Sequence, residues 1–187
     1  MITDPASRGG TLLPIARAAI SVALGRSLAA AENADWLQES GATFVTLMRH
    51  GQLRGCIGTL QARRSLLADV KANAVAAALH DPRFSPLTLT ELADTLIEVS
   101  VLSAMQAMHF DSEADALAQL RPGLDGVVFE FERCRSTFLP QVWEQLPTTL
   151  EFMAQLKRKA GRSADFWDAD VRLHRYSVSK WKEAGGS

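Results

Sequence analysis

The amino-acid sequence predicts an α+β protein with a mixed, largely antiparallel sheet flanked by helices. Segments in which apolar residues recur at helical spacing are interspersed with segments that alternate as strands do, and the first two strand segments form a hairpin pattern. In addition, 47% of the 187 residues are apolar, which is enough to bury a sizeable core. No long polar linker and no internal repeat divides the chain, so we expect a single domain.

The first half begins with a packing helix from Leu12 to about Ala31, in which apolar residues keep helical spacing. Two strands follow, Ala42 to Met48 and Leu53 to Ile57, joined by a short connection that holds Gly51. This arrangement predicts a β-hairpin.

The next helix, LLADVKANAVAAALH, has Ser65 as its predicted cap and one face of small residues. Prolines in DPRFSPLTLTEL end it, and Thr88 with Glu91 has the spacing of a capping box. The segment TLIEVSVLS then alternates as a strand, and we expect its face with Ile97 and Val99 to be buried.

The second half contains a short capped helix, DSEADALAQL, and two strands, DGVVFEF and RSTFLP, around the turn ERC. PQVWEQL predicts one or two helical turns. A capping box of Thr148 and Glu151 precedes the helix LEFMAQLKRKAG, which we expect to end at Gly161. A last strand, VRLHRYSV, is predicted to be half exposed.

Composition excludes several classes of function. Twenty basic and twenty-one acidic residues leave a formal charge of −1, so no overall field attracts nucleic acid or an acidic membrane. The start of the chain lacks the pattern of a secretory signal, and no apolar run is long enough to span a membrane. Cys56 and Cys134 are too far apart in sequence for a metal knuckle and too few for a disulfide framework. We therefore expect a cytoplasmic protein without an intrinsic metal.

The stretch GQLRGCIGTL is the candidate site, and Cys56 is its candidate catalytic residue. Gly55 and Gly58 free the backbone to present amide groups to an anion, and Arg54 favours a thiolate. His50 and His80 are the candidate bases. The alternative is structural, because cysteine is often buried and the glycines allow close backbone approach. On regular alternation, Arg54 and Cys56 share one face of the strand, opposite Leu53 and Ile57, unless the glycines break the register.

Two further arginines are candidates for binding a carboxylate or phosphate, Arg83 in DPRF and Arg135 before TFLP. The structural alternative pairs Arg83 with Asp81 and gives Glu98 a salt-bridge partner rather than an acid–base role. Gly55 to Gly58 also has the GxxG form of a KH nucleic-acid loop, although that loop joins two helices. Lys157, Arg158 and Lys159 are expected to form a solvated face.

The chain resembles the AMMECR-type domain, also named protein A of the AmmeMemoRadiSam system. The resemblance runs from about Leu12 to Trp181 and rests on ordered motifs: LRGCIGTL, DPRFSPLTLTELADTLIEVSVLS, GLDGVVFE, RSTFLPQVWEQLP, EFMAQLKRKAG and RLHRYSVSKW. It implies one domain over residues 12–181, with two unequal lobes and a cleft, between flexible termini at 1–11 and 182–187.

The resemblance also implies partners, a Memo-type protein and a radical S-adenosylmethionine protein. This chain lacks the cysteine triplet of an iron–sulfur cluster, so we expect it to carry no cofactor of its own. The expected function is to bind a substrate or a partner segment at a cleft bounded by Arg54 to Thr59, with Arg83 and Arg135 nearby. An independent thiol enzyme using Cys56 and a nucleic-acid adaptor are the alternatives.

Overall fold

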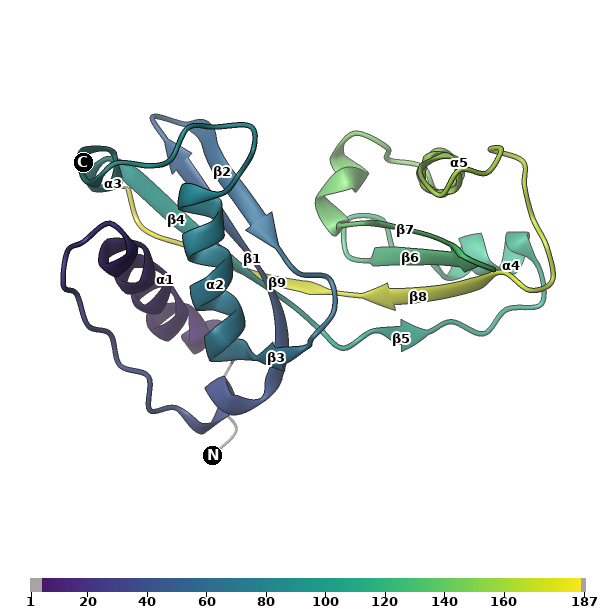
Figure 1. Ribbon diagram of the computed structural model, residues 1–187. Helices are drawn as coiled ribbons and strands as arrows, with labels where there is room; N and C mark the ends of the chain where they lie inside the picture. Colours follow the sequence, from purple (N-terminus) through teal and green to yellow (C-terminus); the bar gives the residue numbers. More distant parts are fainter. Residues whose placement is uncertain (1–4, 186–187) are drawn as a thin grey trace. The chain divides into compact units, whose positions relative to one another are not determined.

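A computed structural model describes residues 5–185 of the chain. It divides into two compact units (Figure 1). The first unit comprises the chain up to Leu102 together with the segment from Ser179 onward, and the second unit comprises Ser103–Val178. Each unit has its own sheet and its own hydrophobic core, as expected of an α+β protein with antiparallel pairing.

The first unit has a five-stranded sheet in the order β2-β1-β4-β9, with β3 paired to the start of β1. The strands are β1 (Ser40–Arg49), β2 (Gln52–Gly58), β3 (Arg64–Ser65), β4 (Thr95–Leu102) and β9 (Val178–Lys182). The helices are η1 (Pro5–Arg8), α1 (Gly9–Ala23), η2 (Asp35–Gln38), α2 (Leu66–Leu79) and α3 (Leu89–Ala93). The predicted hairpin is therefore confirmed as β1 and β2, which are antiparallel.

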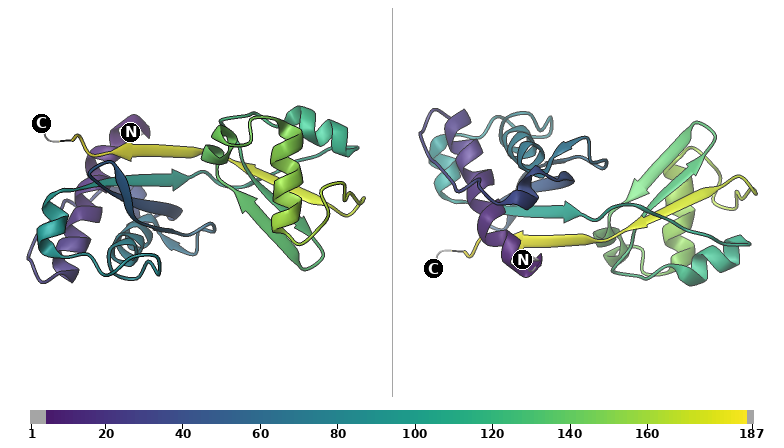
Figure 2. Two further views of the ribbon diagram at one scale, coloured as in Figure 1. Left: turned by 90° about the horizontal axis from the view of Figure 1, so that it is seen from above. Right: turned by 90° about the horizontal axis from the view of Figure 1, so that it is seen from below.

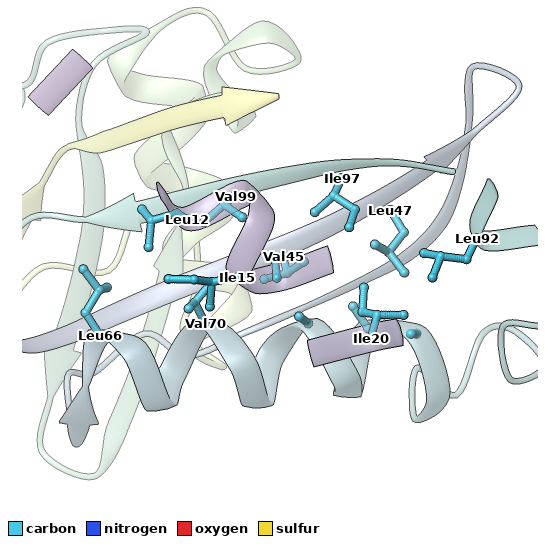
Figure 3. Close-up of a cluster of buried hydrophobic side chains, with 14 of the residues drawn as sticks. Leu12, Ile15, Ile20, Val45, Leu47, Leu66, Val70, Leu92, Ile97 and Val99 are labelled. Carbon is cyan, nitrogen blue, oxygen red and sulfur yellow. The ribbon is translucent and has the colours of Figure 1, made fainter. Parts of the chain in front are cut away.

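The core of the first unit lies between one face of this sheet and the helices α1 and α2 (Figure 3). Val45 and Leu47 of β1 meet Ile97 and Val99 of β4 there, and all four are fully buried. The predicted buried face of β4 is thus confirmed at Ile97 and Val99. Because side chains alternate along a strand, the intervening residues of β1 and β4 face away from the helices.

Helix α1 is shorter than the sequence suggested. It ends at Ala23 instead of about Ala31, and Gly25 follows with φ +85°. A glycine in this left-handed conformation is a frequent helix terminator. The remaining predicted residues, up to Ala31, belong to an irregular segment that extends to Ala34, in spite of their alanines.

The parts of the chain that we expected to be flexible termini contain regular structure. Residues 5–8 form η1, α1 begins at Gly9, and β9 includes Lys182. Beyond β9, the Glu183 carboxylate accepts hydrogen bonds from Arg17 of α1, 2.6 Å from its Nε, and from the backbone of Ile97. The other residues of the predicted flexible termini, 1–4 and 186–187, lie outside the described residues.

The second unit has a four-stranded sheet in the order β5-β8-β6-β7. Its strands are β5 (Gln106–Ala107), β6 (Gly126–Phe131), β7 (Cys134–Phe138) and β8 (Arg172–Tyr176). Its helices are α4 (Glu113–Gln119), η3 (Pro140–Glu144) and α5 (Thr149–Lys159). The single strand predicted near the end of the chain is in fact two, because Ser177 separates β8 from β9.

Helix α5 lies across one face of the second sheet (Figure 2). Phe152 of α5 is fully buried, and its ring stacks on that of Trp143, with centroids 3.8 Å apart. The solvated face expected for Lys157 is wrong, since this side chain is only 2% exposed. Its ammonium group donates to Glu113 of α4 at 2.6 Å and to the Phe166 carbonyl at 2.9 Å. A buried charge needs such partners.

None of the helices within residues 5–185 is long and apolar enough to cross a membrane.

Candidate functional site on the first sheet

The LRGCIG segment forms most of β2, an edge strand of the first sheet. Its register with β1 shifts between Leu47 and Met48: Gly55 lies opposite Leu47, but Leu53 lies opposite Met48. Arg54 is the extra residue of this bulge. The expected regular alternation is therefore wrong at Leu53, which shares a sheet face with Cys56.

The two glycines of the motif are required by close packing. A side chain at Gly55 would collide with the carbonyl oxygen of Ala77 in α2, and one at Gly58 would collide with the ring of Phe44. The backbone of β2 thus lies directly against α2 at Gly55. This supports the structural interpretation of these glycines, that they permit close backbone approach.

The peptide group of Cys56 is held by a carboxylate and an arginine from the DPRF segment. Its N–H donates to Asp81 Oδ2 at 2.9 Å, and its carbonyl accepts from Arg83 Nη2 at 3.2 Å. Arg83 also donates to both oxygens of Asp81, at 2.7 and 2.9 Å. These hydrogen bonds, chiefly those from Arg83, lower the pKa of Asp81 below its ordinary value. The anion that the Cys56 amide faces is therefore the protein's own carboxylate.

Arg54 is paired in a similar way with Glu91 of α3. Its Nε and Nη2 each donate to one Glu91 oxygen at 3.2 Å, and Arg49 donates to the same carboxylate at 3.1 Å. Glu91 also completes the capping box with Thr88, as predicted. Arg54 and the Thr88 amide lower the pKa of Glu91 to about 2. The Arg54 side chain is only 13% exposed, so this arginine fixes the bulge rather than facing solvent.

Thr59 belongs to a buried polar cluster that the sequence did not reveal. Its centre is Asp69 of α2, whose side chain is 1% exposed. One oxygen of Asp69 accepts from the Thr43 amide at 2.8 Å and from the Thr59 hydroxyl at 2.7 Å. Arg64 and Asn73 complete the cluster. The available signal was the pair Asp69 and Asn73, one helical turn apart in a largely apolar helix.

The Cys56 thiol lies on the sheet face that turns away from α1 and α2. It shares a hydrogen bond with the hydroxyl of Thr46, with Sγ and Oγ1 3.2 Å apart. Thr46 lies opposite Cys56 on one side and opposite Glu98 of β4 on the other. Lys180 of β9 pairs with Glu98 at 3.3 Å, which confirms the salt-bridge reading of Glu98. A thiol, a hydroxyl, a carboxylate and an ammonium group thus form one row across the sheet, which we call the polar row.

Neither candidate base is hydrogen-bonded to the thiol within residues 5–185. His50, with φ 51°, and Gly51, with φ 76°, form the turn between β1 and β2, and His80 follows the end of α2. The thiol has Thr46 as its hydrogen-bonding partner. In the same part of the chain, no group of three His, Cys, Asp or Glu side chains is arranged to hold a metal ion.

The predicted site residues are divided between the two units. Arg54, Cys56, Thr59 and Arg83 all belong to the first unit. Glu91 binds Arg54, Asp81 binds Cys56 and Arg83, and Asp69 binds Thr59. Arg135 belongs to the second unit, where its Nε lies 2.8 Å from Glu130 Oε1. The structural alternative for Arg83, its pairing with Asp81, is present, but the sequence did not identify Glu91 as the partner of Arg54.

Comparison with known proteins places most of this chain within one family. The family model AMMECR1 matches residues 13–181. A protein of Methanothermobacter thermautotrophicus is 35% identical, over 97% of this chain and 98% of its own length. A protein of Thermotoga maritima is 38% identical over 74% of this chain and 76% of its own length. The crystal structure of an uncharacterized protein from Pyrococcus horikoshii matches with a TM-score of 0.78 and 30% identity, covering 94% of this chain and 91% of that one.

Proposed function

The chain belongs to the AMMECR1 family, and from that premise we propose that it is a cytoplasmic binding component of a modification system. Its partners in this proposal are a Memo-type protein and a radical S-adenosylmethionine protein, which the LRGCIG and accompanying motifs imply by resemblance. The proposed binding surface is the face of the first sheet that carries the polar row. It would contact a substrate or a segment of a partner protein.

The observation that carries this proposal is the way β2 is held. Asp81 and Arg83 bind both polar groups of the Cys56 peptide, and Glu91 binds Arg54. These contacts hold the strand rigid from its edge and leave the thiol half-buried. A surface whose backbone is fixed in advance loses little conformational entropy when it binds.

The polar row suits recognition of a mixed polar and apolar segment. Glu98 is 18% exposed and Lys180 is 46% exposed, so both retain contact with solvent. Met48 lies one row away on the same face, opposite Leu53, whose side chain is 40% exposed. Apolar contacts beside a few fixed polar groups are typical of binding sites.

A single pair of variants tests the surface. Leu53→Lys places a charge on the proposed face, whereas Val22→Lys makes the same kind of change on α1, where Val22 is 58% exposed. We expect the Memo-type and radical S-adenosylmethionine proteins to co-purify from the native organism with the wild-type chain and with Val22→Lys, but not with Leu53→Lys. If the two partner proteins were recovered equally with both variants, the proposed binding surface would be wrong. If they were not recovered with the wild-type chain, the proposed partners would be wrong.

An independent enzyme that uses Cys56 is the second candidate, and the half-exposed thiol favours it. Nucleophilic catalysis normally requires an adjacent base or another means of forming the thiolate. The pH dependence of Cys56 alkylation in a Cys134→Ser background separates the two functions. A labelling midpoint well below the roughly 8.5 of an ordinary thiol would favour the enzyme. A midpoint near that value would favour the binding component.

The nucleic-acid alternative has less support. The GxxG sequence lies inside β2, whereas the KH loop joins two helices. Arg54 and Arg83 are both occupied by carboxylates. Binding to RNA that weakens steeply with added salt would restore this alternative.

A further inference from the structure

The second sheet carries a group of basic side chains that the proposed function does not use. Its face toward α5 is apolar, with Val127, Phe129 and Leu173 in the core. On the opposite face, the register places Glu130 of β6 directly between Arg135 of β7 and Arg172 of β8. Three charged residues therefore stand side by side on three adjacent strands.

Positive charge exceeds negative charge in this group. The Glu130 carboxylate pairs with Arg135, with Nε and Oε1 2.8 Å apart. Arg172 is exposed, and within residues 5–185 its guanidinium has neither an ion pair nor a hydrogen bond. Two guanidinium groups thus flank one carboxylate, and only that of Arg135 is paired with it. This leaves a full set of donors available on Arg172.

His174 adds a third basic side chain beside the same carboxylate. It lies two residues from Arg172 on β8, and its Nδ1 is 4.0 Å from Glu130 Oε2. That nitrogen is buried and has no hydrogen-bond partner. Such a group carries a free-energy cost unless a ligand or another polar atom satisfies it.

We propose that Arg135, Arg172 and His174 form a binding site for a compact oxyanion, a carboxylate or a phosphate group. Residues directly opposite on neighbouring strands have Cβ atoms about 5 Å apart, so arginines on both sides of Glu130 can reach one anion between them. Planar guanidinium groups suit bidentate binding of such oxyanions. Glu130 takes part of this position as an internal anion through its ion pair with Arg135.

An anion site of this kind predicts that removing Glu130 strengthens anion binding, which an ordinary surface ion pair would not. Because Glu130 competes for Arg135, Glu130→Gln should strengthen anion binding by about two- to fivefold. Arg172→Gln should weaken it by at least about tenfold, through loss of a charge-assisted hydrogen bond. Arg158→Gln is the matched control, since Arg158 is exposed on α5 and lacks an ion partner within residues 5–185.

The experiment is a titration of the full chain with inorganic phosphate and, separately, with acetate, at constant ionic strength and pH. Binding is followed by the NMR signals of the His174 ring and of the backbone amides of β8. Saturable binding of either anion, with the stated effects of the three variants, supports the site, and the tighter anion identifies its class. Absence of saturation with both anions, equal weakening by Arg172→Gln and Arg158→Gln, or weaker binding by Glu130→Gln would overturn it.

Discussion

In each unit, helices cover one face of that unit's own sheet, but the contacts that fix the strands in place differ between the two units. In the first unit, the buried carboxylates of Asp69 and Asp81 accept hydrogen bonds from backbone amides of β1 and β2. In the second unit, the stacked rings of Trp143 and Phe152 pack under the sheet, and Lys157 joins α5 to α4. A carboxylate can fix an edge strand without covering its outer face. This difference explains how the first unit holds β2 in place while the Cys56 thiol stays half-exposed.

Loss of the ring stack should have the largest effect on stability. Phe152→Ala removes a fully buried ring and should lower the free energy of unfolding by about 3–5 kcal/mol, through lost burial and a remaining cavity. Urea denaturation monitored by tryptophan fluorescence measures this free energy of unfolding. Leu150→Ala, in the same helix at a side chain that is 69% exposed, should change it by less than about 0.5 kcal/mol. Similar values for both would mean that the second unit does not depend on this core.

The matching test in the first unit is Asp69→Ala. It leaves the Thr43 amide and the Thr59 hydroxyl without their acceptor and Arg64 without its partner. We expect a loss of about 3 kcal/mol, typical of breaking a buried charged network. Asp94→Ala is the control, because Asp94 is 55% exposed and lies 3.9 Å from Arg49. A loss as small as that of the control would contradict the role assigned to buried carboxylates.

The close approach of β2 and α2 gives a third, smaller effect. Gly55→Ala forces a methyl group against the Ala77 carbonyl, and we expect about 1–3 kcal/mol of destabilisation from overpacking. Gly10→Ala, in α1 with no atom within 4 Å of the added group, should be neutral or stabilising by up to about 1 kcal/mol. Thermal unfolding of the two variants measures both effects. If Gly55→Ala left the stability unchanged, β2 would not lie directly against α2 at Gly55.

The free energy of unfolding of the first unit should decrease gradually as the pH is lowered. The pKa of Glu91 is about 2 in the folded chain, against an ordinary value of 4.5, chiefly because Arg54 donates to it. A carboxylate with a lowered folded pKa contributes stability above its unfolded pKa and loses that contribution as the pH falls through the folded value. Stability should therefore decline from about pH 4.5 to about pH 2, and less steeply in Glu91→Gln.

The measurement is the urea midpoint at several pH values across this range. Glu144→Gln removes the same charge at an exposed position and should leave the wild-type slope unchanged. Parallel slopes for wild type and Glu91→Gln would show that the Arg54–Glu91 pair does not contribute to the acid dependence.

Local features of the sequence determined much of the fold. The caps at Ser65 and Thr88, the alternation in β4 and the hairpin of β1 and β2 all rest on residues within a few positions of each other. Such signals act over one turn or one strand pair and can be read without knowing the rest of the chain. The pairing of Arg83 with Asp81, two positions away, was accessible for the same reason.

Tertiary structure alone decided the features that join distant segments. The bulge at Arg54 depends on Glu91 of α3, and the burial of Lys157 depends on Glu113 and the carbonyl of Phe166. The buried cluster at Asp69 of α2 needs Thr43 from β1. Periodicity predicts which face of an element is apolar, but not which distant polar group will be brought to it. Since a buried charge is tolerated only where such a partner arrives, these positions were fixed by the fold.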